Sequence, residues 1–362
     1  MRPEAVEAML AVLTERFGNP SGSHAVSREA RKTVDEARDT VAHCLGARPA
    51  EIVFTGGGTE ADNLAIFGAH AVRPGPTVCS AIEHHAVLHA CDALGDNRVA
   101  RVDGAGMVDL DHLAELLDPS VSVVSVMLAN NEVGTIEPLG EVAALVRRLA
   151  PEAVVHTDAV QAFQWVDVAA LAAPADLVAV SAHKFGGPKG VGALVVSQGV
   201  TVKPIIHGGG QERDRRSGTH NVAGIVGMAA AMRATVDERE ATVARVRALR
   251  DRLADGLLAT VAGCRETGDR VTKIAGNCHV SFEGVESEEL LVLLDAAGVY
   301  ASAGSACASG AVDPSHVLAA MGMSRTRAIE SLRLSLGTGT TDADIDLALE
   351  VIRAAVVRLR IG

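Results

Sequence analysis

Lys184 has neighbours in the sequence that could support covalent chemistry. It lies in the run Ser181-Ala-His-Lys-Phe-Gly-Gly-Pro-Lys-Gly190, where an apolar stretch ends in a turn rich in Gly and Pro. An amine at the end of a strand, beside Ser181 and His183, can form a Schiff base if its site lowers its pKa. A surface lysine in a loop is the alternative, and it would be preferred if this motif stood alone.

Cys307 is the second candidate, in the run Ala301-Ser-Ala-Gly-Ser-Ala-Cys-Ala-Ser-Gly310. Its small neighbours predict an accessible loop, which suits a thiol that must reach a substrate and then carry a product away. A cysteine buried for packing is the common alternative. The lack of bulky neighbours weakens that alternative here.

A glycine-rich turn could bind an anion. Gly56, Gly57 and Gly58 follow the apolar run Ile52–Phe54 and lead into a helical pattern. Glycines let the backbone approach a ligand, and the N–H groups at a helix start bind phosphate. A tight structural turn is the alternative. The turn is not a Walker A loop, because no Gly-Lys-Ser/Thr sequence follows it.

Two residues at strand ends could contact an aromatic cofactor. Asp158 ends the apolar run that starts at Val154, where a buried carboxylate needs a cationic partner such as a protonated pyridine nitrogen. His84 follows a strand and could stack on a planar ring and move protons. The alternatives are a helix N-cap for Asp158, and a cap or a core residue for His84.

Arg333 alternates with Leu332 and Leu334 in an apolar run, so its side chain should point away from theirs. A guanidinium in that position could hold a substrate carboxylate through two hydrogen bonds. An arginine that faces solvent from a strand is the alternative.

The segments that position these residues alternate between strand and helix patterns, which predicts an α/β domain with a mainly parallel sheet. The expected strands are 51–55, 77–81, 99–102, 121–128, 154–157, 177–181 and 192–196, with helices at 26–45, 59–72 and 86–94. A long helix over 222–260 then leads to strand 278–282, helix 286–297, strand 332–336 and helix 341–360. We expect a large domain over 12–244 and a smaller α+β domain over 245–362, with 1–11 packed on the small domain.

The composition excludes several classes of function. The formal net charge is −12, and aromatic residues make up 2% of the chain, which argues against a broad nucleic-acid surface. We find no apolar run of about 18 residues and no signal-peptide pattern, so a cytoplasmic protein without a membrane span is expected. The six cysteines show no CxxC spacing, so we expect free thiols and no metal site.

The order of these motifs is more specific than any one of them. Together with Asn130-Asn-Glu-Val-Gly134, Gly208-Gly-Gly-Gln-Glu-Arg213 and Arg216-Ser-Gly-Thr219, it resembles the cysteine desulfurases of the class V aminotransferase group over nearly the whole chain. The resemblance implies the type I pyridoxal-phosphate transferase fold, with a three-layer αβα large domain and a smaller α+β domain that carries the cysteine loop. It also implies pyridoxal 5′-phosphate as cofactor and L-cysteine as substrate.

The resemblance assigns roles to twelve residues. It implies that Lys184 binds the cofactor, Asp158 its ring nitrogen, Gln161 its hydroxyl and His84 its ring face, while Gly58, Thr59, Ser181 and His183 bind its phosphate. Thr219 would reach the phosphate of a partner subunit in a homodimer, Asn131 and Arg333 would bind the substrate carboxylate, and Cys307 would accept the sulfur as a persulfide.

The implied reaction converts L-cysteine to L-alanine and transfers sulfur to an acceptor protein, such as an iron–sulfur scaffold or a tRNA-thiolation protein. A selenocysteine lyase or an aminotransferase on the same fold is the alternative, and aminotransferases need no thiol at Cys307. A non-catalytic scaffold is a further alternative, because the usual first strand of the family does not precede Met1.

Overall fold

A computed structural model describes residues 1–303 and 314–361. The chain forms two compact units. The first unit comprises 1–100, 110–128 and 138–239, and the second comprises 101–109, 129–137 and 240–362. Residues 1–11 therefore belong to the first unit, whereas we expected them on the small domain. Arg2 explains this difference, since its N–H donates to Gly186 O (2.7 Å) and its guanidinium pairs with Glu238 (2.7 Å).

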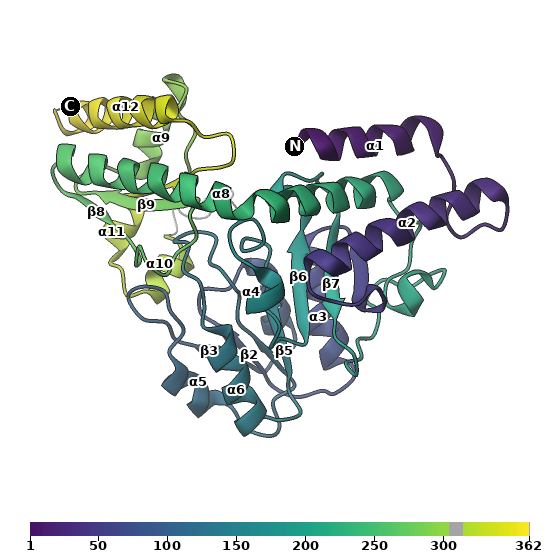
Figure 1. The fold of residues 1–362 in the computed structure, drawn as a ribbon. Coiled ribbons are helices and arrows are strands. Elements are labelled where there is room, and N and C mark those ends of the chain that lie inside the picture. Colours follow the sequence, from purple (N-terminus) through teal and green to yellow (C-terminus); the bar gives the residue numbers. More distant parts are fainter. Residues whose placement is uncertain (304–313, 362) are drawn as a thin grey trace. The chain divides into compact units, whose positions relative to one another are not determined.

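The first unit is built on a seven-stranded sheet with the order β1-β7-β6-β5-β4-β2-β3. Figure 1 labels β2, β3, β5, β6 and β7 of this sheet. Its strands are β1 (Ile52–Thr55), β2 (Thr77–Ser80), β3 (Asn97–Ala100), β4 (Val123–Ser125), β5 (Val154–Asp158), β6 (Leu177–Ser181) and β7 (Gly192–Val196). Strands β3, β2, β4, β5 and β6 pair in parallel, whereas β7 is antiparallel to both β6 and β1. Every residue of β4 and β6 is buried, as expected for central strands covered on both faces.

Helices cover this sheet in the first unit. They are α1 (Pro3–Glu15), α2 (Ala25–Cys44), α3 (Gly58–His70), α4 (His85–Ala93), α5 (Leu110–Leu116), α6 (Leu139–Leu149) and α7 (Val168–Leu171), with 3-10 turns at Pro49–Glu51, Ala182–Phe185 (η2) and Gln211–Asp214 (η3). Helix α3 packs across the sheet, where Ala61, Leu64 and Ala65 join a core with Leu177 and Leu194.

The second unit contains a three-stranded antiparallel sheet with the order β10-β9-β8. Its strands are β8 (Cys264–Glu266), β9 (Asn277–Phe282) and β10 (Ser331–Ser335), and its helices are α9 (Ser287–Ala296), α10 (His316–Ala320), α11 (Arg325–Ile329) and α12 (Asp342–Ile361). Helix α8 (Val222–Thr260) is continuous through residues 239 and 240, where the division between the units falls.

The mainly parallel α/β architecture predicted from the sequence is confirmed. The expected strand 99–102 is shifted to β3 because Val102 instead forms an isolated bridge with Val108. The sequence analysis did not assign strand β8 or helices α1, α5, α6, α7, α10 and α11. Among the described residues, no helix combines the length and apolar character that crossing a membrane requires.

Candidate active site

The predicted cofactor residues gather at one edge of the first unit's sheet. Strands β2, β4, β5 and β6 are parallel, so their carboxyl ends lie at the same edge. His84 follows β2, Asp158 ends β5, Ser181 ends β6, and Lys184 lies in η2 directly after β6. Ligands of open α/β sheets bind at this edge, so the predicted strand-end positions are consistent with a binding site.

Asp158 provides a buried carboxyl group at this edge. Its exposed fraction is 5%, and its Oδ1 accepts a hydrogen bond from Val160 N (2.8 Å). Burial and the nearby Asp62 carboxyl raise the pKa of Asp158 to about 7, although His156 and Lys184 oppose that rise. A cation held against this carboxyl would return its pKa toward the ordinary value. The site therefore fits a protonated ring nitrogen.

The glycine-rich turn approaches the ends of β5 and β6 closely. Gly57 has a φ of 144°, which favours glycine, and helix α3 begins at the next residue. A Cβ atom on Gly58 would lie 2.7 Å from Val160 Cγ2 and 3.4 Å from the Ser181 Cβ atom. Ser181 Oγ lies 2.9 Å from His183 Nδ1. Helix-start N–H groups, a hydroxyl and an imidazole together form a donor set that fits a phosphate.

Lys184 is exposed in η2, a short turn that ends at Gly186 with a φ of 84°. Burial lowers the pKa of the neighbouring His183, and the charges of Lys184 and Lys189 lower it further. The amine is therefore close enough to influence both His183 and Asp158 electrostatically. This position is compatible with an amine that binds a ligand lying against Asp158.

His84 caps helix α4, which was one of the two structural alternatives considered for it. Its Nδ1 accepts a hydrogen bond from Ala86 N (3.1 Å), which fixes the ring orientation. His84 and Thr59 line the same pocket of about 450 Å³, together with Asn63 and His89. The capping role is therefore compatible with a place in the candidate site, since His84 and Thr59 line one pocket.

Gln161 and Thr219 are less closely constrained. Gln161 lies half-buried in the turn after β5, and Thr219 is exposed. The segment that leads to Thr219 is tied to the glycine-rich turn through Glu60, which pairs with Arg216 Nε (2.7 Å) and accepts from Gly56 N (2.7 Å). This salt bridge ties Arg216, three residues before Thr219, to the first turn of helix α3.

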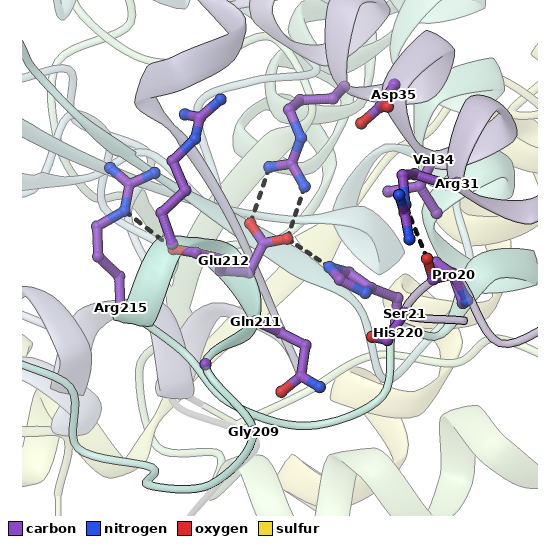
Figure 2. A pocket seen from close by; sticks show the side chains of 13 residues that line it. Pro20, Ser21, Arg31, Val34, Asp35, Gly209, Gln211, Glu212, Arg215 and His220 are labelled. Atoms are coloured by element: carbon purple, nitrogen blue, oxygen red, sulfur yellow. Dashed lines mark hydrogen bonds and ion pairs between the residues drawn. The ribbon is translucent and has the colours of Figure 1, made fainter. Parts of the chain in front are cut away.

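A buried hub at Glu212 was not singled out from the sequence. Its carboxylate accepts two hydrogen bonds from Arg38 (2.6 and 2.8 Å) and one from Phe54 N (2.9 Å), and it lies 2.6 Å from His220 Nε2. Figure 2 shows Glu212 directed toward His220 in the lining of a pocket of about 390 Å³. Glu212, Arg213 and Asp214 all have positive φ values, of 51°, 57° and 64°. Such strain persists only where surrounding contacts enforce it, and the hub supplies those contacts.

The predicted substrate residues lie in the second unit. Arg333 on β10 donates from its guanidinium to Asn131 O (3.1 Å), so the structure brings these two predicted residues together. His279 lies opposite Arg333 on β9 and is fully buried. Burial lowers the pKa of His279 to about 3, and the positive charges of Lys273, Arg333 and Arg327 lower it further. The imidazole opposite Arg333 is therefore neutral near pH 7.

Cys307 lies outside the described residues, but both flanks of its segment are placed in the second unit. Ser302 exchanges two backbone hydrogen bonds with Arg333 (2.7 and 3.2 Å). On the other side, Ser315 Oγ donates to Glu132, the residue next to Asn131. The described residues Ser302 and Ser315 therefore lie beside the two predicted substrate-binding residues. The sequence offered no signal for these anchors, because they pair residues far apart in the chain.

No group of three or more His, Cys, Asp or Glu side chains positioned to bind a metal occurs within residues 1–303 and 314–361. Within the same residues, Cys44, Cys79, Cys91, Cys264 and Cys278 are unpaired thiols.

Comparison with known proteins extends this picture. The family model described as "Aminotransferase class-V" matches residues 1–348. The chain is 46% identical to an IscS-like cysteine desulfurase from Mycobacterium tuberculosis, covering 99% of this chain and 94% of the relative. It is 43% identical to the cysteine desulfurase IscS from Methanosarcina thermophila, covering 99% and 90%.

Solved structures agree with these matches. A NifS-like protein superposes with a TM-score of 0.93 at 35% identity, covering 99% of this chain and 96% of that one. A structure described as SspA in complex with cysteine gives a TM-score of 0.81 at 29% identity, covering 94% and 97%.

Proposed function

Since this chain belongs to the class V aminotransferase family, we propose that it is a cysteine desulfurase that converts L-cysteine to L-alanine through Cys307. Relatives 40–46% identical over 99% of the chain support this activity. The observation that carries the proposal is the buried Asp158 carboxyl. It lies at the same sheet edge as the Gly58 helix start and the Lys184 turn.

Pyridoxal 5′-phosphate is the cofactor that this donor set suits, with Lys184 as its covalent anchor. When bound, it supplies an electron sink that stabilises negative charge on the substrate α-carbon. Asp158 would hold the ring nitrogen, Gln161 the ring hydroxyl and His84 the ring face, while Gly58, Thr59, Ser181 and His183 would hold the phosphate.

The chain's own residues then move a proton and a sulfur atom. The Lys184 amine accepts the α-proton of L-cysteine. The Cys307 thiolate attacks the substrate sulfur, so a sulfur–sulfur bond forms as the substrate carbon–sulfur bond breaks. The bonding electrons stay with carbon, which takes up a proton to become the methyl group of alanine. One sulfur atom moves from L-cysteine to Cys307, so the reaction requires no external oxidant.

Substrate and partners follow from the remaining residues. Arg333 and Asn131 would bind the carboxylate of L-cysteine, and the similarity to SspA in complex with cysteine supports that substrate. We assign Thr219 to the phosphate site of a partner subunit in a homodimer, in line with its exposed position. The persulfide would pass to an iron–sulfur scaffold or a tRNA-thiolation protein. The need for a free Cys307 thiol favours the cytoplasm.

Mass spectrometry after incubation with pyridoxal 5′-phosphate and L-cysteine tests the proposal. We expect an added mass of about 32 Da on Cys307, which is one sulfur atom held by a nucleophilic thiol. Cys307→Ala should keep the cofactor's visible absorbance but release no sulfide, and Lys184→Ala should lose turnover. Cys264→Ala is the control, since Cys264 is a partly exposed free thiol.

Three results would contradict the proposal. Normal sulfide release from Cys307→Ala would exclude the sulfur-acceptor role. Amino-group transfer to an oxo acid without alanine formation would indicate an aminotransferase. A purified protein that binds no pyridoxal 5′-phosphate would indicate a non-catalytic scaffold.

A further inference from the structure

A buried polar group lies in the first unit beyond the residues assigned to the reaction. It consists of Asp62 on α3, Ser125 at the end of β4, and His156 on β5. Their exposed fractions are 1%, 0% and 0%. Because His156 and Asp158 are two residues apart on one strand, their side chains point to the same face of the sheet. The group therefore lies next to the proposed ring-nitrogen site.

Two buried atoms of this group, one on His156 and one on Asp62, lack a hydrogen-bond partner among the described residues. Ser125 Oγ lies 2.8 Å from His156 Nδ1, whereas His156 Nε2 lies 3.5 Å from Asp62 Oδ1. Neither Nε2 nor Oδ1 has a hydrogen-bond partner among the described residues, and both atoms are buried. Buried polar atoms are nearly always paired, and a movement of about 0.5 Å would bring these two to hydrogen-bond distance. One of the two atoms must then contribute the proton.

Burial and the surrounding charges determine whether Asp62 Oδ1 or His156 Nε2 carries this proton. The Asp62 carboxyl is close enough to the Asp158 carboxyl, and to that of Glu83 after β2, to raise the pKa of each. Among the described residues, no lysine or arginine forms an ion pair with Asp62. Burial raises the pKa of Asp62 to about 8 and lowers the pKa of His156 to about 4, against the opposing charge of Asp158. Burial also holds the pKa of Glu83 well above its usual range, and Cys79, Asp158 and Asp62 raise it further. Near neutral pH, a protonated Asp62 beside a neutral imidazole is therefore the favoured state.

We propose that Asp62 is a positioning residue whose neutral carboxyl donates a hydrogen bond to His156 Nε2, which leaves Asp158 as the anion of the site. In this arrangement the neutral His156 carries its proton on Nδ1, and this N–H donates a hydrogen bond to Ser125 Oγ, so the ring is fixed at both nitrogens. An ionised Asp62 would favour protonation of Asp158 and so remove the charge that the ring nitrogen needs. The effect on the charge of Asp158 toward the ring nitrogen rests on the proposed function, whereas the hydrogen bond between Asp62 and His156 does not.

Infrared spectroscopy of the cofactor-free chain at pH 7 tests the protonation of Asp62. We expect Asp62→Asn to remove one band of a protonated carboxyl group. Asp39→Asn, a substitution at an exposed position, is the control and should remove none. Nitrogen NMR should also show a neutral His156 with its proton on Nδ1. An unchanged spectrum in Asp62→Asn, or an imidazolium signal from His156, would overturn the proposal.

The positioning role is tested by the affinity for pyridoxal 5′-phosphate, measured by absorbance. The amide of Asp62→Asn can donate the same hydrogen bond, whereas Asp62→Ala leaves Nε2 without a donor. We expect the Asn variant to bind at least about tenfold more tightly than the Ala variant. Equal affinities in the two variants would refute the positioning role. If the wild-type chain binds no cofactor, the proposed function fails, and the infrared result still decides the protonation of Asp62.

Discussion

Substituting Glu212 with Gln tests whether the buried hub stabilises the first unit. Burial alone would raise the pKa of Glu212, but the hydrogen bonds from Arg38 and His220 reverse that effect and lower it from 4.5 to about 2. The pKa of Glu212 is thus roughly 2.5 lower than its ordinary value. A pKa difference of one corresponds to about 1.36 kcal/mol, so the ionised carboxylate contributes about 3 kcal/mol to folding. Glu212→Gln keeps the shape of the side chain and removes the charge. We therefore expect its free energy of unfolding to fall by about 3 kcal/mol at pH 7.

The pH dependence provides a second check. Because the pKa of Glu212 is lower in the folded state, its contribution is complete above about pH 4.5 and is lost as the pH falls toward 2. At pH 4 the difference between wild type and variant should be about 1 kcal/mol smaller than at pH 7. A difference that grows as the pH falls would contradict the assigned pKa.

Urea unfolding followed by tryptophan fluorescence is the appropriate assay. Trp165 is the single tryptophan of the chain, is buried, and lies in the first unit with Glu212. The control is Glu36→Gln, whose partner Lys32 lies 3.7 Å away with both side chains exposed. Such surface pairs contribute at most about 1 kcal/mol. If Glu212→Gln destabilised the unit no more than Glu36→Gln does, the hub would have no stabilising role.

Two further predictions concern packing and substrate binding. A Cβ atom on Gly192 would lie 2.6 Å from Val180 O and 2.8 Å from Gly57 C, so Gly192→Ala should destabilise the first unit by about 1–3 kcal/mol in the same urea assay. Gly140→Ala, which meets nothing within 4 Å, should be neutral or stabilising, and equal effects would contradict the packing argument. Arg333→Gln should raise KM for L-cysteine by about tenfold or more, through loss of a charged hydrogen bond to the carboxylate. The exposed Arg265 provides the control Arg265→Gln, and steady-state kinetics showing the same KM for both variants would argue against carboxylate binding by Arg333.

The sequence predicted the elements whose burial follows a regular period. The apolar positions Ala30, Val34, Ala37 and Val41 identified helix α2, and they are buried as predicted. In contrast, β4 spans Val123–Ser125, although the run 121–128 is buried throughout. An apolar run shows where the core lies, whereas strand limits depend on the neighbouring strands with which the run pairs.

For the candidate site, the sequence could indicate residues at strand ends but not the contacts between distant residues. Strand-end positions identified Asp158 and Ser181, because the carboxyl ends of parallel strands share an edge. The contacts among residues distant in sequence could not be obtained in this way. His156 and Asp62 are 94 positions apart, and Arg38 and Glu212 are 174 apart, so only the packed structure brings each pair together.

The discontinuous make-up of the second unit limits how this protein can be divided or recombined. Ile136 N donates to Thr272 O (2.8 Å), Ile274 N donates to Gly134 O (2.9 Å), and Asn277 Nδ2 donates to Glu132 O (2.8 Å). A gene fragment that begins at residue 240 would lose all three bonds, because segment 129–137 is encoded upstream. Exchange of the carboxyl-terminal half between relatives therefore requires that the short upstream segments be exchanged with it.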